Sequence, residues 1–347
     1  MKAARLYQYD PTMQTDLQLD SVPEPKIGAP DEVIVRIGAA GLCRTDLHII
    51  EGILRPDWDA DGKLLPYTLG HENAGWIEEV GPGVTRVKKG DAVICHPLRT
   101  CGVCYGCRMG MDMYCERSLF PGINANGGFA EYLATNERTL IKLASNVLPV
   151  DCAPLADAGI TAYRAAKRAA ALLRPGTYCV VLGVGGLGHI GLQTLHALCA
   201  TRTIAVDTSP AACQLARDLG AQHVLDGSGD LVEQVKDLTH GGAHAVLDFV
   251  AERGAEQLAW KMLRNGGTHY VIGYGGALDL PTAHMVVHEV SVSGVLVGNY
   301  MELVELMELH AEGRVKLQGR EYKLDDINTA VDDFQHRRFV GRAVIVP

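Results

Sequence analysis

The segment Tyr178-Cys-Val-Val-Leu-Gly-Val-Gly-Gly-Leu-Gly188 decides the fold that we predict for this chain. Its first five residues form an apolar run typical of a buried strand, and its last six match the pattern G-x-G-x-x-G. Residues 189–200 continue as a helix-forming stretch. In a strand–turn–helix order, Gly183 permits a tight turn, Gly185 lets the backbone approach a pyrophosphate, and Gly188 lets the helix pack closely on the strand. The segment therefore predicts a dinucleotide-binding βαβ unit.

An acidic residue follows at the end of the next predicted strand, residues 203–206. Asp207 lies nineteen residues after Gly188. A carboxylate at this position accepts hydrogen bonds from the two ribose hydroxyls of NAD and repels the additional phosphate of NADP. The neighbouring Thr208 and Ser209 supply no cation for that phosphate. NAD is therefore the predicted cofactor.

Helical and apolar stretches continue to alternate after Asp207. Four more strands are predicted, which gives six in all, the number in a doubly wound parallel sheet. The fold class is therefore α/β, with a Rossmann domain. The predicted strands are 178–182, 203–206, 223–225, 245–249, 268–272 and 290–294, and the helices between them are 189–200, 211–219, 231–238 and 254–263.

The rest of the chain has a different pattern of apolar residues and turns, which predicts a second, β-rich domain. Before residue 150 the sequence consists of short apolar or alternating runs separated by glycine and proline turns, as at 33–37, 75–80 and 91–94. A polar segment, 55–64, predicts a surface loop. A helix over 301–312 leads to a short β-rich tail. We predict a catalytic domain over 1–158, the Rossmann domain over 159–294, and a return to the first domain over 295–347.

Length and composition restrict the class of protein. A chain of 347 residues with 47% hydrophobic and 21% charged residues fits a globular protein of two domains. The net charge of −9 and the lack of a basic cluster argue against a nucleic-acid partner. Apolar runs are short, so no membrane span is expected, and the first residues lack the apolar core of a signal peptide. We therefore expect a cytoplasmic protein.

The strongest local metal signal is a cluster of four cysteines. Their spacing is C-x2-C-x2-C-x7-C, within a glycine-rich lobe of about residues 95–116. Four thiolates can close tetrahedrally on Zn²⁺ at about 2.3 Å, which leaves no open position and makes the zinc structural. The pattern lacks the C-x3-C-P step of an iron–sulfur run and the basic and aromatic neighbours of a nucleic-acid zinc knuckle. The predicted ligands are Cys101, Cys104, Cys107 and Cys115.

A second candidate centre begins with Gly41-Leu-Cys-Arg-Thr-Asp-Leu-His48. Cys43 can bind a borderline metal as thiolate, and Thr45 can pass on a proton. Asp46 can orient a metal-bound imidazole, and His48 can exchange a proton with solvent near neutral pH. The stretch combines the side chains that a catalytic metal site and its proton path require.

Further ligands for this centre come later in the chain. His71 is a plausible second ligand, and Glu72 is a carboxylate next to it. Cys152 and Asp157 lie five residues apart, and the residues alone allow either of them as the third ligand.

Together these motifs resemble one family. The pattern Gly70-His71-Glu72-x2-Gly75-x5-Gly81-x2-Val84, the four-cysteine lobe, residues 43–48 and the glycine fingerprint occur in the order found in zinc-containing alcohol dehydrogenases of the medium-chain dehydrogenase/reductase superfamily. The chain looks most similar to bacterial and archaeal tetrameric NAD-dependent members. The resemblance covers nearly the whole chain. It implies a GroES-like catalytic domain, a Rossmann domain, an active-site cleft between them, and a homotetramer, with a dimer as the alternative.

The resemblance also implies the ligands of a catalytic zinc. These are Cys43, His71 and the residue four positions before the threonine of Thr161-Ala-Tyr163, which is Asp157. Many relatives have cysteine there, but a carboxylate carries the same charge as a thiolate. Cys152 is five residues out of register. Cys43, His71 and Asp157 would neutralise Zn²⁺ and leave one position open.

The roles of the neighbouring residues follow from the same resemblance. Zinc would act as a Lewis acid that lowers the pKa of the alcohol, and NAD⁺ would take the hydride. Thr45 would pass the alcohol proton through the nicotinamide ribose to His48 and solvent. Asp46 would hydrogen-bond the ligand His71, and Glu72 would approach the metal during ligand exchange.

Cofactor and substrate contacts are implied in less detail. Arg44 and Arg342 match positions that contact the pyrophosphate, and Thr161 lies where the nicotinamide is buttressed. Phe120, Ile123 and the segment His96-Pro-Leu98 would line an apolar pocket beside Thr45. The other expected cofactor contacts are Gly183, Gly185, Gly186, Leu187, Gly188, Asp207, Ile272 and Gly273.

The predicted activity is reversible oxidation of a primary or secondary alcohol, aryl alcohols included, by NAD⁺ to an aldehyde or ketone. One alternative is a zinc-independent quinone or enoyl reductase on the same fold, which would need NADPH and no metal ligands. Another is a non-catalytic NAD-binding protein, which loss of a ligand or of Thr45 would favour. A polyol dehydrogenase is the nearest rival, although such relatives often lack the four-cysteine lobe.

Overall fold

A computed structural model describes residues 1–53 and 55–347 of the chain, which form two compact units. The first unit comprises residues 1–158, 298–311 and 317–347, and the second comprises residues 159–297 and 312–316. The sequence placed the return to the first domain at residue 295. The short segment 312–316 lies within the predicted return to the first domain but belongs to the second unit.

The second unit is built on a six-stranded sheet in the order β11-β10-β9-β12-β13-β14, with every neighbouring pair parallel. This is the doubly wound arrangement, and its switch point lies between β9 and β12. The strands are β9 (Tyr178–Leu182), β10 (Arg202–Val206), β11 (His223–Leu225), β12 (Ala243–Asp248), β13 (Leu263–Val271) and β14 (Ser291–Gly294).

Helices cover both faces of this sheet, as the alternation of side chains along β9 shows. Cys179 and Val181 pack into one apolar cluster with α5 and α6, whereas Val180 and Leu182 pack into another with α8 and α9. A strand buried on both faces requires an uninterrupted apolar run, which is what its sequence provides. The α/β prediction is confirmed. The helices are α5 (Ala158–Ala170), α6 (Gly188–Leu198), α7 (Pro210–Asp218), α8 (Leu231–Thr239), α9 (Ala255–Lys261) and α10 (Thr282–His288).

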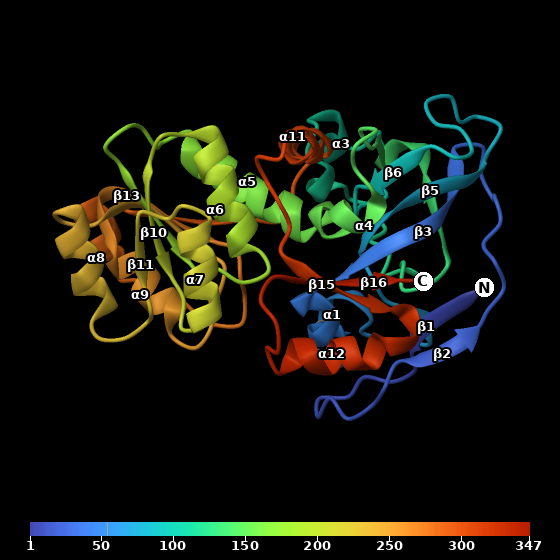
Figure 1. Cartoon of the computed structure of the whole chain (residues 1–347), viewed down its shortest axis with the longest axis horizontal. Helices are drawn as coiled ribbons and strands as arrows, with labels where there is room; N and C mark the ends of the chain where they lie inside the picture. The colour runs from blue at the N-terminus through green and yellow to red at the C-terminus, as the bar shows by residue number, and fades with distance from the viewer. Residues whose placement is uncertain (54) are drawn as a thin grey trace. The chain divides into compact units, whose positions relative to one another are not determined.

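The first unit is β-rich and contains both termini (Figure 1). Its larger sheet has the order β15-β16-β3-β5-β6-β8, with β7 also paired to β3, and a smaller sheet has the order β2-β1-β4. The C-terminal strand β16 pairs antiparallel with β3, so the chain returns to its first domain. The strands are β1 (Lys2–Leu6), β2 (Gln18–Ser21), β3 (Glu32–Leu42), β4 (Tyr67–Thr68), β5 (Glu72–Val80), β6 (Ala92–Cys95), β7 (Tyr132–Asn136), β8 (Leu140–Lys142), β15 (Gly319–Lys323) and β16 (Arg342–Val346).

Strand β3 is longer than the predicted run 33–37 and extends directly to the candidate metal site. Its second half is composed of glycine, alanine and one leucine, which gave no strand signal in the sequence. Small residues are required there because β5 lies very close: a Cβ on Gly38 would lie 2.6 Å from the Trp76 ring, and one on Gly41 would overlap the Glu72 carboxylate. The close packing of β3 on β5 brings Cys43 next to the residues that begin β5.

Most helices of the first unit are short, and several of them are not predicted by the sequence. Helix α2 (Arg55–Trp58) lies in the predicted loop 55–64, and α12 (Ile327–Gln335) lies in the predicted β-rich tail. Ile327, Ala330 and Phe334 recur at helical spacing in α12 and pack on the core, so a sequence signal was present. Among the described residues, no helix is both long and apolar enough to cross a membrane. The other helices are α1 (Arg44–Ile50), α3 (Tyr105–Arg108), α4 (Pro149–Cys152) and α11 (Tyr300–Ala311).

Candidate metal centres and cofactor site

Four buried or partly buried side chains form a donor cluster in the first unit. The ligand atoms of Cys43, His71, Glu72 and Asp157 all lie within 4.8 Å of one another. Cys43 ends the β3 segment as the N-cap of α1, His71 directly precedes β5, and Asp157 follows the 3₁₀ turn Ala153–Ala156. Three segments that are distant in sequence thus bring a thiol, an imidazole and carboxylates to one point.

The electrostatics around His71 favour a cation. Its side chain is fully buried, with Asp46 Oδ1 3.2 Å from Nδ1 and Asp157 Oδ2 3.4 Å from Nε2. Burial opposes a charged ring, but Asp46, Asp157 and Cys43 together raise the pKa of His71 well above its ordinary value. Four of these polar atoms make no well-aligned hydrogen bond within the described residues: both ring nitrogens of His71, Asp46 Oδ1 and Asp157 Oδ1. A thiol, an imidazole and a carboxylate with orphaned donor atoms fit Zn²⁺.

The two candidates for the third ligand lie in different surroundings. Cys152 is fully buried, and its thiol donates to the Pro149 carbonyl at 3.6 Å. It is not part of the donor cluster, whereas Asp157 is. Burial raises the pKa of the Cys152 thiol, as expected for a small core residue.

Glu72 is held by an ion pair that the sequence did not reveal. Its Oε1 accepts a hydrogen bond from the Ala158 backbone N–H at 3.0 Å, and its Oε2 pairs with Arg342. Both side chains are almost fully buried. Burial raises the pKa of Glu72, and the Arg342 charge opposes that shift. Arg342, expected at the pyrophosphate, is thus the buried partner of Glu72, and a contact with the cofactor stays a prediction.

Helix α1 carries the predicted relay residues. Asp46 Oδ2 accepts from the Cys43 backbone N–H at 2.8 Å, which fixes the start of the helix, and its other oxygen faces His71. Thr45 Oγ1 lies 3.8 Å from Cys43 Sγ. Arg44 Nε donates to His48 Nε2 at 3.1 Å across one helical turn. The helix therefore places the Thr45 hydroxyl beside the Cys43 thiol, and the His48 imidazole about one turn further along the helix.

Among the predicted pocket residues, Phe120 reaches the metal centre. Its ring meets the His71 ring edge-on, with the ring centroids 5.7 Å apart. Ile123 and Leu98 are buried. His96 accepts from the Leu98 N–H and contacts the Gly298 carbonyl through Nε2 at 3.0 Å, and burial lowers its pKa. Substrate contact by these residues stays a prediction.

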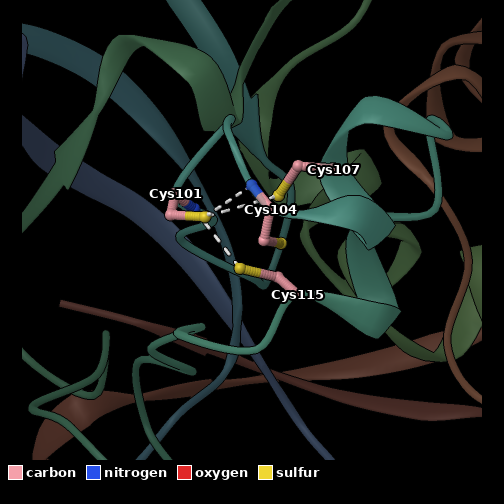
Figure 2. Close-up of side chains that lie close together, drawn as sticks. All are labelled: Cys101, Cys104, Cys107 and Cys115. Carbon is pink, nitrogen blue, oxygen red and sulfur yellow. Dashed lines mark hydrogen bonds between the residues drawn. The ribbon is translucent and has the colours of Figure 1, made fainter.

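The four-cysteine cluster has the geometry of a structural zinc site. Figure 2 shows the four sulfurs gathered around one centre, and all four lie within 4.8 Å of one another. Backbone N–H groups of Val103 and Cys104 lower the pKa of Cys101 to about 6, which favours the thiolate that zinc requires. Burial raises the pKa of Cys107 to about 11, a shift that a bound cation would reverse. The donor set fits Zn²⁺ with no open position.

The glycine fingerprint of the second unit has the shape of a phosphate cradle. Gly183 has φ +83°, which favours glycine, and a Cβ on Gly188 would overlap the Gly183 carbonyl. Above Gly185 there is open space, because an added Cβ would meet no atom within 4 Å. Gly186 and Leu187 are partly exposed beside it. The loop is closed toward the sheet and open on its outer side, as binding of a pyrophosphate requires.

Asp207 lies at the end of β10 and is already oriented by the backbone. Its two oxygens accept from the N–H groups of Val184 and Ser209, each at 2.8 Å. Ile272 and Gly273 follow β13, and Thr161 lies partly buried on α5. His189, which is not among the predicted site residues, has its Nδ1 2.7 Å from the Gly185 carbonyl and holds the fingerprint loop. Its position directly after the fingerprint was the available signal.

Comparison with known proteins agrees with this geometry. Residues 29–145 match the alcohol dehydrogenase GroES-like domain, and residues 186–312 match the zinc-binding dehydrogenase domain. The chain is 36% identical to an alcohol dehydrogenase of Geobacillus stearothermophilus, with 99% of each chain covered. It is 35% identical to an NAD-dependent alcohol dehydrogenase of Sulfurisphaera tokodaii, with 100% of each covered.

The chain belongs to the zinc-binding alcohol dehydrogenase family. A crystal structure of the alcohol dehydrogenase from Aeropyrum pernix superposes with a TM-score of 0.94, at 45% identity and with 100% of each chain covered. Membership of this family, the four-cysteine cluster and the Cys43–His71 centre together indicate two zinc ions and NAD as cofactors.

We predict that Asp157→Ala removes the catalytic zinc and leaves the structural zinc in place. Zinc content measured by atomic emission should fall from about two to about one ion per chain, because a third ligand is lost, and turnover should disappear. Cys152→Ser is the matched control and should keep both ions. Full zinc content in the Asp157 variant would show that the third ligand lies elsewhere.

Two glycine substitutions should separate folding from cofactor binding. Gly188→Ala should lower the free energy of unfolding in urea by about 3 kcal/mol, because its Cβ overlaps the Gly183 carbonyl. Gly185→Ala should change that energy by less than about 1 kcal/mol. It should nevertheless weaken NADH binding, measured by fluorescence titration, because the new methyl group occupies the cradle. Unchanged NADH affinity in the Gly185 variant would place the pyrophosphate elsewhere.

Proposed function

We propose that the chain catalyses NAD⁺-dependent oxidation of simple primary and secondary alcohols, and the reverse reduction of aldehydes and ketones. The observation that carries the proposal is the donor set of buried Cys43 and His71 and partly buried Asp157, with the Thr45 hydroxyl beside Cys43. When bound, zinc supplies Lewis acidity to the substrate oxygen, and NAD⁺ supplies the hydride acceptor.

The chain's own residues prepare this chemistry. The Cys43 thiolate and the Asp157 carboxylate offset the two charges of the metal, and Asp46 orients His71 through Nδ1. Thr45 takes the alcohol proton, and His48 exchanges it with solvent. The Phe120 ring against His71 excludes water from one side of the centre and presents an apolar surface to the substrate. Together with Ile123 and Leu98, it favours substrates with an apolar group beside the hydroxyl.

A second candidate is oxidation of a sugar with NADP⁺. A D-arabinose 1-dehydrogenase (NADP⁺) of Saccharolobus solfataricus is 35% identical over 94% of this chain. Two features of this chain favour NAD and simple alcohols instead. Asp207 places a carboxylate where the NADP phosphate would bind, and the apolar pocket residues offer few partners for sugar hydroxyls.

The proton path gives a direct test of the proposal. Thr45→Val keeps the side-chain volume but removes the hydroxyl, so kcat for benzyl alcohol or 2-butanol with NAD⁺ should fall by about 100-fold or more. Thr45→Ser is the matched control and should retain most activity. Equal activity of the valine and serine variants would contradict the assigned relay, and absence of NAD⁺ reduction by the parent protein across an alcohol panel would contradict the function.

We also propose a cytoplasmic homotetramer. None of the ten cysteines, all among the described residues, is joined to another by a disulfide, which is usual for a protein of a reducing compartment. Val286 and Val287 on α10 are 80% and 74% exposed, and Leu296, just beyond the sheet-edge strand β14, is 58% exposed. Exposed apolar side chains and an unpaired sheet edge are both features that subunit interfaces commonly cover.

The assembly proposal predicts the effect of charge at this surface. Replacing both Val286 and Val287 by lysine should reduce the mass measured by sedimentation equilibrium from that of a tetramer to that of a smaller species, because the apolar contact would have to bury two charges. Val103→Lys, at a residue 58% exposed in the cysteine lobe, is the control. A tetramer that persists in the double variant would exclude this surface as an interface.

A further inference from the structure

We propose that Asp248 is a positioning residue for the dinucleotide, acting through the turn of residues 249–254. The inference rests on the cofactor site described above. Asp248 is the last residue of β12, and its register partners are Leu182 of β9 and Val271 of β13. It therefore lies at the carboxyl end of the sheet, at the switch point where ligands of doubly wound sheets bind.

The polar atoms of Asp248 hold two turns at the carboxyl end of the sheet at once. Its side-chain Oδ1 accepts from the N–H groups of Val250 and Ala251 at 3.0 and 2.8 Å. Its backbone carbonyl accepts from the N–H groups of Ile272 and Gly273 at 2.9 and 3.0 Å. One residue thus ties the turn after β12 to the turn after β13, which contains two of the predicted cofactor contacts.

The turn after β12 also packs against the glycine fingerprint. The Phe249 N–H donates to the Leu182 carbonyl at 3.0 Å, directly before Gly183. A Cβ on Gly183 would lie 2.6 Å from Val250 Cγ2. The turn is therefore in van der Waals contact with the loop that holds the pyrophosphate, and a shift of Val250 would change the shape of that loop.

The backbone of this turn needs external support. Ala251 has φ +46° and Arg253 has φ +57°, in the left-handed region that non-glycine residues rarely adopt. Such conformations persist where surrounding structure determines them, and they are common at ligand sites. The hydrogen bond from the Ala251 N–H to Asp248 Oδ1 is the closest such constraint.

His269 in turn fixes the carboxylate. Its Nε2 lies 3.1 Å from Asp248 Oδ2, and both side chains are fully buried. Because the carboxylate only accepts hydrogen bonds, Nε2 donates. Nδ1 has no hydrogen-bond partner among the described residues. The bond to Asp248 therefore determines the orientation of the ring, and it turns Oδ1 of the carboxylate toward the Val250 and Ala251 N–H groups.

The experiment compares NADH affinity with stability in the full-length zinc-loaded protein. Asp248→Ala removes the acceptor, and we expect the Kd for NADH, measured by fluorescence titration, and the KM for NAD⁺ to rise by about tenfold. The KM for the alcohol and the zinc content should not change. Asp248→Asn retains an acceptor oxygen toward the turn, and its amide can donate to Nε2 if the His269 proton moves to Nδ1. That variant should bind NADH within about threefold of the parent.

Thr239→Val is the matched control for stability. Thr239 is buried in the same unit and caps the Gly242 N–H at 2.8 Å, at the other end of the sheet from Asp248. Its replacement should lower the thermal midpoint without changing NADH affinity. A purely structural role of Asp248 would make its alanine variant behave in the same way, with lower stability and unchanged Kd, and would overturn the proposal. An asparagine variant as weak as the alanine variant would also overturn it.

Two further variants keep the test decisive. If Asp248→Ala yields no folded protein, His269→Leu takes its place: weaker NADH binding supports the proposal, and unchanged binding refutes it. Asp207→Ala tests the cofactor site itself. If Asp207→Ala weakens NADH binding and the Asp248 variant does not, only the positioning role fails. If neither changes binding, the assigned cofactor site fails.

Discussion

The first unit depends on one constraint: two carboxylates and a thiol surround the buried imidazole of His71. His71 is fully buried between Asp46 and Asp157, with Cys43 as a further donor. Donors of this kind are stable in a protein interior only with a cation between them, because an uncompensated buried charge costs several kcal/mol, of the order of 3–5. Family membership identifies that cation as zinc. The neighbouring Glu72 has its own counter-charge in Arg342 and is therefore not left for the metal to neutralise.

The larger sheet of the first unit brings these side chains together. Cys43 is delivered by β3, His71 by the residue before β5, and Arg342 by β16, and these three strands are neighbours in one sheet. Gly38 and Gly41 allow β3 and β5 to approach closely enough for the donors to meet. In the second unit the corresponding constraint is the turn after β9, where the Gly188 backbone contacts Gly183 and the outer side of Gly185 stays open. In each unit, glycines allow the close backbone contacts or the open space that the candidate site requires.

The residues explain why some features were predictable and others were not. The apolar run before Gly183 and the four clustered cysteines are local signals, and the Rossmann domain and the zinc lobe followed from them. Asp157 is predicted as the third ligand from its alignment with the family motif, and its side chain lies in the donor cluster, whereas Cys152 does not. The Arg342–Glu72 pair joins residues 270 positions apart, so no local pattern could show it. The predicted strand 33–37 is shorter than β3 because the second half of β3 consists mainly of glycine and alanine. These residues have low strand propensity, and they fit here because β5 packs closely against them. Helix α12, by contrast, was predictable, because its apolar residues recur at helical spacing.

We infer that, of the two zinc ions, catalysis depends on the one held at the Cys43–His71 centre. The most direct measurement is zinc content and NAD⁺ reduction followed together during stepwise removal of metal by a chelator. The account predicts about two zinc ions per chain at the start and loss of activity with the first ion, since the catalytic site keeps an open coordination position and the four-cysteine site does not. Full activity in protein that retains about one zinc ion, held by the four cysteines, would contradict it.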